Sequence, residues 1–202
     1  KTGVDFINLS ITNDSKYLYI KFETSEEIDL SDGDYDIELL LDTDNNIQTG
    51  WNPGYNDNIG VEIGIMFNQK YVWYNVPDPD IQLSLYDIDI YPAPTITSNK
   101  FEIAISLESE YDGQLLFPNS ELKLQLRDWV STDNIPNNES EIIYNINSNP
   151  QNYSSIEIEK SNPNLIRLTA YNVWANGFND NKRLPQLKNT LQLLNSDIFA
   201  FS

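Results

Sequence analysis

Short segments in which apolar and polar residues alternate recur along most of the chain, and they constrain its fold more than any other feature. In residues 16–24, the apolar side chains of Leu18, Ile20 and Phe22 alternate with Tyr17, Tyr19 and Lys21. Successive side chains of a β-strand point to opposite faces, so this alternation is typical of half-buried strands. Further segments repeat the pattern at 35–44, 59–67, 70–76, 80–90, 100–108 and 121–130. Turn-forming clusters of Asn, Asp, Gly and Pro separate them, and the whole predicts an antiparallel β-sandwich.

The pattern changes near residue 160. Residues 165–173 are typical of a buried strand, and 196–202 of a second one. Between them, residues 185–195 carry Leu187, Leu191 and Leu194 on one helical face, with Pro185 near the first turn. The sequence therefore predicts a mainly β chain, in which the antiparallel β-sandwich is followed by an incomplete α/β segment of strand, helix and strand.

Charged residues are distributed unevenly along the chain. The chain has a formal net charge of −19, and residues 1–159 hold 29 acidic and 7 basic groups against 2 and 5 in residues 160–202. This difference favours two domains, 1–159 and 160–202. A single domain with one solvated acidic face is the alternative.

Two residue types are missing, and they exclude several kinds of site. The chain has no Cys and no His. Disulfides, histidine-based catalytic triads and the usual catalytic zinc sites are therefore excluded. The acidic surface disfavours direct binding of nucleic acid by residues 1–159. No apolar run is long enough for a membrane span.

The last segment, LIRLTAYNVWANGFNDNKRLPQLKNTLQLLNSDIFAFS (165–202), resembles the start of the endonuclease/exonuclease/phosphatase family of metal-dependent phosphodiesterases. The matching residues are Tyr171, Asn172, Val173, Arg183, Leu187, Leu191, Asp197 and Ile198. The resemblance implies that Asn172 belongs to an active site that holds magnesium or another divalent cation and acts on nucleic acid or another phosphoester. In the other interpretation, Asn172 only closes a strand in a turn.

The sequence stops at Ser202, one position before the metal-binding Glu of that family. The family's later Asp and His residues are absent as well. We therefore expect the chain as it stands to be inactive, because one Asn cannot hold a catalytic metal ion.

Residues 39–65 of the acidic region resemble extracellular β-sandwich modules related to carbohydrate-binding family 9. Asp42, Asp44, Thr49 and Gly50 match the Asp-x-Asp and Thr-Gly signature of these modules. The two carboxylates are two residues apart at a strand end, so they can converge on a hard cation, for which calcium is the natural candidate. Asp57 and Glu62 are candidates to complete the site.

The spacing in this loop excludes an EF-hand, because Ile47 and Pro53 stand where Gly and Glu are required. In the alternative interpretation, the loop is an Asx-rich turn in which Asp42 and Asp44 accept hydrogen bonds from backbone amides.

Aromatic residues near this loop are candidates for stacking on a sugar ring. Trp51, Tyr55 and Trp73 are the foremost of them. Aromatic residues on strands more often belong to the core, where they bury large apolar areas.

Two functions follow from these observations. In the first, the chain is the accessory β-sandwich region of a secreted metal-dependent phosphodiesterase, a nuclease or phosphatase. In the second, it is a calcium-stabilised module that binds a polysaccharide or a cell-surface partner without catalysis. Both place the protein outside the cytoplasm: secreted, at the cell surface or in the periplasm. A structural spacer is a third possibility.

Overall fold

The computed structural model describes residues 3–69, 71–74, 81–93, 96–150, 160, 162–171 and 183–201. The chain divides into two compact units, Lys1–Asn152 (unit 1) and Tyr153–Ser202 (unit 2). Within the described residues the fold is mainly β with antiparallel sheets, which confirms the predicted fold class.

The first sheet of unit 1 contains four antiparallel strands in the order β1-β2-β8-β7. Their bounds are β1 (Phe6–Asn13), β2 (Tyr17–Asp29), β8 (Thr97–Ser106) and β7 (Ile90–Pro92). In β2 the side chains of Leu18, Ile20 and Phe22 are buried, as the alternation predicts. One face of this sheet is therefore apolar and covered.

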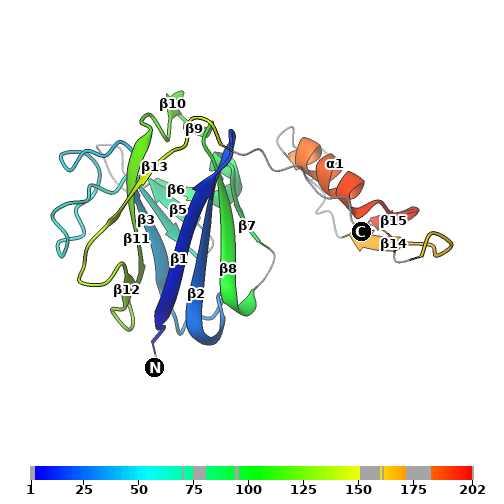
Figure 1. The fold of residues 1–202 in the computed structure, drawn as a ribbon, viewed down its shortest axis with the longest axis horizontal. Coiled ribbons are helices and arrows are strands. Elements are labelled where there is room, and N and C mark those ends of the chain that lie inside the picture. The colour runs from blue at the N-terminus through cyan, green and yellow to red at the C-terminus, as the bar shows by residue number, and fades with distance from the viewer. Residues whose placement is uncertain are drawn as a thin grey trace. The chain divides into compact units, whose positions relative to one another are not determined.

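The second sheet of unit 1 has the order β12-β11-β3-β4-β5-β6, and β13 also pairs with β11. The bounds are β3 (Ile37–Asp42), β4 (Ile63–Met66), β5 (Tyr71–Tyr74), β6 (Ile81–Ser84), β11 (Glu121–Asp128), β12 (Asn134–Ile135) and β13 (Ile142–Asn145). All six residues of β3 are buried, so this central strand is covered on both faces. A short separate hairpin, β9 (Glu110–Tyr111) and β10 (Gln114–Leu115), lies near one end of the unit (Figure 1).

The core of unit 1 is built from both sheets. Phe22 of the first sheet packs at ring-centroid distances of 5.1 Å from Phe101 and 5.4 Å from Phe67. Leu39 and Leu124 of the second sheet belong to the same apolar cluster and are fully buried. Two antiparallel sheets that share one core are compatible with a β-sandwich (Figure 1).

Residues 80–90 do not form the single strand that their alternation predicts. Strand β6 ends at Ser84, a 3₁₀ turn η1 (Leu85–Ile88) follows, and β7 begins at Ile90 in the other sheet. Asp89 takes a left-handed backbone conformation with φ of 52° between them. The turn lets Leu85 and Ile88 both enter the core while the chain crosses from one sheet to the other.

Unit 2 has the predicted order of strand, helix and strand. β14 (Leu168–Tyr171) and β15 (Ile198–Phe201) pair in parallel, and α1 (Arg183–Leu194) lies between them in the chain. The prediction that both strands are buried is wrong for the described residues, since Leu168 is 64% and Ile198 52% exposed. Each strand pairs only with the other among the residues that the structure describes, and three of the four residues in each strand are exposed.

Candidate cation site and binding cleft

Asp42 closes the long loop that joins β3 to β4. Its side chain is fully buried at the last position of β3. One carboxylate oxygen accepts the backbone N–H of Asn46 at 3.1 Å, and the other accepts that of Gly60 at 3.2 Å. The ammonium group of Lys123 lies 3.8 Å from the second oxygen. Asp42 therefore ties the beginning of the loop to its end.

Asp44 organises the next turn of the same loop. Its carboxylate accepts the backbone N–H of Asn46 at 2.9 Å and the hydroxyl of Thr49 at 2.8 Å. These bonds are the ones expected for an Asx-rich turn. They do not exclude a cation, because each carboxylate oxygen has two lone pairs and can accept a hydrogen bond while it binds a metal.

Glu62 brings a third carboxylate to this place from just before β4. Its side chain is 8% exposed, and its Oε2 accepts the backbone N–H of Thr43 at 2.8 Å. The other oxygen, Oε1, is buried and has no hydrogen-bond partner. The hydroxyl of Thr49 lies close enough to oppose the rise in the pKa of Glu62, but its hydrogen bonds go to Asp44 and to the carbonyl oxygen of Asn46, each at 2.8 Å.

The electrostatics of Glu62 follow from this placement. Burial raises the pKa of Glu62 to about 8, and the nearby charges of Asp44 and Asp42 add to the rise, while the Thr43 amide and the Thr49 hydroxyl oppose it. A negative charge at Glu62 is therefore disfavoured unless a positive charge accompanies it.

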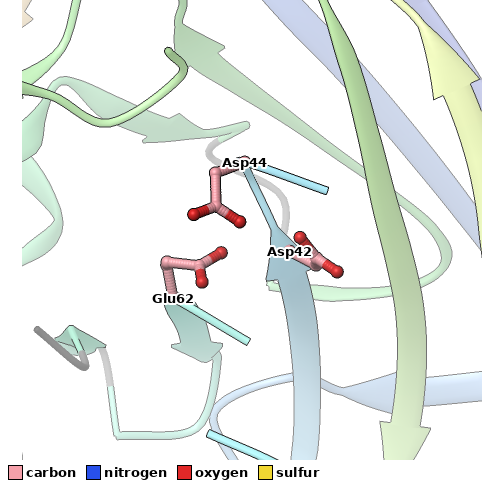
Figure 2. Close-up of side chains that lie close together, drawn as sticks. All are labelled: Asp42, Asp44 and Glu62. Atoms are coloured by element: carbon pink, nitrogen blue, oxygen red, sulfur yellow. The ribbon is translucent and has the colours of Figure 1, made fainter. Parts of the chain in front are cut away.

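The three carboxylates form one group. One oxygen each from Asp42, Asp44 and Glu62 lie within 4.8 Å of one another. Figure 2 shows the side chains of Asp44 and Glu62 facing each other beside the end of β3. Calcium–oxygen bonds measure about 2.3–2.6 Å, so oxygens at this separation can contact the same ion. Asp57 lies outside this group and is exposed.

Gly50 allows the loop to close over Glu62. Its φ is +68°, and a Cβ atom there would lie 2.6 Å from both Glu62 Oε1 and the carbonyl oxygen of Val61. Only glycine fits this approach without displacing the carboxylate.

A cleft of about 940 Å³ opens beside the carboxylates. Asp44 and Glu62 line it, and the β9–β10 hairpin contributes Glu110, Gln114 and Leu115. The other lining residues are Thr43, Gln48, Thr49, Gly50, Tyr74, Gly113, Leu116 and Pro118. The lining thus combines carboxylates, neutral polar groups and apolar side chains, and the part of it that the structure describes contains no Lys or Arg.

The three aromatic residues expected to stack on a sugar lie elsewhere in unit 1. Trp51, Tyr55 and Trp73 are half-buried and pack against the small apolar cluster of Leu40, Ile59 and Val61. The rings of Trp51 and Trp73 meet edge to face, with centroids 5.5 Å apart at 89°. Sugar stacking by these residues therefore stays a prediction.

A pair of charged residues that the sequence analysis did not single out accompanies these rings. Glu38 accepts the indole N–H groups of Trp73 and, at 2.6 Å, Trp129. Burial raises the pKa of Glu38 against these two bonds. Opposite it on β11, the guanidinium group of Arg127 lies 3.9 Å above the ring of Tyr55. The only signal in the sequence was their place at polar positions of two predicted strands.

The cleft residues Glu110 and Gln114 also escaped the sequence analysis. Both follow the strand β8 in a short segment without strong alternation, and no local pattern connects that segment to Asp44. Asn172, the candidate catalytic residue of unit 2, lies outside the described residues.

No protein-family model matches the chain, and no curated protein matches it either.

Within the described parts of the chain, no helix has the length and apolar character that a bilayer crossing requires.

Proposed function

We propose that unit 1 is a recognition module without catalysis, which a calcium ion stabilises at Asp42, Asp44 and Glu62 and which binds a polysaccharide or a cell-surface partner. The observation that carries the proposal is the buried Oε1 of Glu62, which has no hydrogen-bond partner. An unsatisfied buried carboxylate oxygen costs free energy, and a cation bound there would offset this cost.

The chemistry of the site favours calcium over magnesium. All three side chains offer oxygen, and they stand on an irregular loop with several Asn and Asp residues. Calcium accepts 6–8 oxygen ligands in flexible geometry, whereas magnesium requires a near-ideal octahedron at about 2.0–2.1 Å.

Thermal melting with calcium tests the site. A ligand that binds only the folded state stabilises it by about 2.7 kcal/mol at a concentration one hundred times its Kd. We expect Tm to rise with calcium well beyond the rise that NaCl of equal ionic strength or MgCl₂ produces. The Glu62→Gln variant should lose this rise, and the matched control Asp57→Asn should retain it.

The Glu62→Gln variant separates a lost cation site from a lost fold. Its amide group can donate to the facing Asp44, so we expect the calcium-free variant to be at least as stable as the wild type. A calcium-dependent rise in Tm that persists in Glu62→Gln would contradict the proposal. So would a wild-type protein that does not respond to calcium.

A second function is proposed for the whole gene product: a secreted phosphodiesterase, nuclease or phosphatase, that depends on magnesium or another divalent cation. The parallel pair β14 and β15 with α1 between them supports this candidate, because it matches the strand, helix and strand of the family resemblance. We expect no hydrolysis of bis-p-nitrophenyl phosphate by residues 1–202 in magnesium or manganese, because Asn172 alone cannot hold a catalytic metal ion. Metal-dependent hydrolysis that the Asn172→Ala variant loses would show that these residues hold more of the catalytic site than the resemblance implies.

A further inference from the structure

The proposed calcium site has one side that faces the cleft. Asp44 and Glu62 line the cleft, whereas Asp42 does not. An ion held between the three would therefore be supported by Asp42 from behind and would present its remaining coordination positions to the cleft. Calcium takes 6–8 oxygen ligands, so three carboxylates leave some of these positions to water or to a ligand.

The charges of the cleft select against an anionic ligand. With the ion bound, Asp44, Glu62 and Glu110 contribute three negative charges to the lining, and no Lys or Arg among the described lining residues balances them. One bound calcium ion would leave the cleft with a net negative charge. A uronate or a phosphate would meet this field at short range and be repelled.

The remaining lining suits a neutral polyhydroxylated ligand. Gln48 and Gln114 offer donors and acceptors without charge, and the carboxylate of Glu110 can accept hydrogen bonds from hydroxyl groups. Leu115, which is 50% exposed on the hairpin, offers an apolar surface for the C–H face of a sugar ring. A volume of about 940 Å³ lies at the upper end of the usual range for ligand pockets and admits more than one ring.

We infer that a neutral sugar binds in this cleft by coordinating the calcium ion directly, through two adjacent hydroxyl groups that replace water. The hydroxyl oxygens supply lone pairs to the ion. The same hydroxyl groups donate hydrogen bonds to the carboxylates and to the side-chain oxygens of the glutamines in the lining. This inference rests on the proposed function. It also places the sugar away from Trp51 and Trp73, whose rings pack against each other.

A glycan array that holds neutral and uronate-containing glycans tests the ligand class. We expect the full chain to bind neutral glycans in CaCl₂ and to release them in EDTA. Glu110→Gln and Gln114→Ala should each weaken binding roughly tenfold through the loss of hydrogen bonds to the ligand. Both variants should retain the calcium-dependent rise in Tm, and the exposed control Glu108→Gln should leave binding and Tm unchanged.

Terbium(III) in place of calcium tests direct coordination. The luminescence lifetimes of the bound ion in H₂O and D₂O report how many waters it holds. Addition of a neutral glycan identified on the array should lower that number in the wild type. An unchanged number of waters, or glycan binding that survives EDTA, would overturn direct coordination by the sugar.

The outcomes separate this inference from the proposal on which it rests. If calcium raises Tm but no neutral glycan binds, or only uronates bind, the inference is overturned and the cation site stands. If calcium does not raise Tm, the cation site itself is overturned.

Discussion

Asp128 is a fully buried carboxylate at the end of β11 that holds three segments of the chain together. It accepts the backbone N–H of Asp36 at 2.9 Å and that of Val4 at 3.3 Å. It also accepts the N–H and the hydroxyl of Ser131, at 2.9 and 2.6 Å. Burial raises the pKa of Asp128, but these hydrogen bonds outweigh burial and hold it below its ordinary value.

The Asp128→Asn variant should destabilise unit 1 by roughly 2–3 kcal/mol, because the amide cannot accept from all of these donors. The pKa of Asp128 is lower in the folded state, so its ionised form contributes stability that is complete above the unfolded value of about 3.9 and is lost as pH falls through the folded value. The difference in the free energy of unfolding between variant and wild type should therefore be largest near pH 7 and narrow below pH 4.

Urea unfolding at pH 7 and at pH 3 measures this difference in the free energy of unfolding. The exposed Asp112→Asn variant is the matched control and should stay within about 0.5 kcal/mol of the wild type. An equal loss at pH 7 and pH 3 would show that the carboxylate charge plays no part.

Gly64 determines how the indole of Trp73 lies on the second sheet. A Cβ atom at Gly64 would lie 2.0 Å from the ring atom Cε2 of Trp73. We expect Gly64→Ala to push the indole away and to lower the free energy of unfolding by about 1–3 kcal/mol. Urea unfolding followed by tryptophan fluorescence measures both effects. Gly33→Ala is the control, since a Cβ there meets nothing within 4 Å, and equal losses in both variants would contradict the steric argument.

Among the elements, those with local periodicity were predictable. The alternation in β2 gave its buried face, and the continuous apolar run of β3 is explained by burial on both faces. The 3₁₀ turn η1 was missed because its apolar residues keep the strand pattern while the chain changes sheets. The exposure of β14 and β15 was missed because an apolar run carries no information about what covers it.

The part of the candidate site that lies on the loop between β3 and β4 was predictable from the sequence. Asp42 and Asp44 follow from their spacing at a strand end, and Glu62 lies at the other end of the same loop. Glu110 enters the cleft through a hairpin distant in sequence, and only the three-dimensional arrangement places it there.

The loop between β3 and β4 should become more ordered when calcium binds. Asp42 connects its two ends, because its carboxylate accepts hydrogen bonds from the backbone N–H groups of Asn46 and Gly60. A cation that fixes this carboxylate also fixes those hydrogen bonds, and local opening becomes rarer. Hydrogen exchange followed by mass spectrometry should therefore show slower exchange in residues 43–62 with calcium. Peptides from β2 should change little, and Glu62→Gln should show no calcium effect; slowing in that variant would contradict the assignment.

At the scale of the whole molecule, the described residues of the main apolar core all belong to unit 1. The buried members of this core run from Val4 to Leu126, and the partly buried residues packed against it end at Ile146. All three carboxylates of the cation site and the described residues that line the cleft lie in the same unit. Unit 1 thus contains a core and a complete candidate site within one stretch of chain.

Residues 1–152 should therefore fold without the rest of the chain. We expect a cooperative thermal transition and a calcium-dependent rise in Tm that matches the rise of the full chain. The acidic charge of this region weakens the fold through self-repulsion, so NaCl alone should raise Tm slightly in both proteins. A rise in Tm with calcium that exceeds the rise with NaCl reports binding at the specific site. A shortened chain that melts without cooperativity, or that loses the calcium response while folded, would show that unit 2 contributes to the core or to the site.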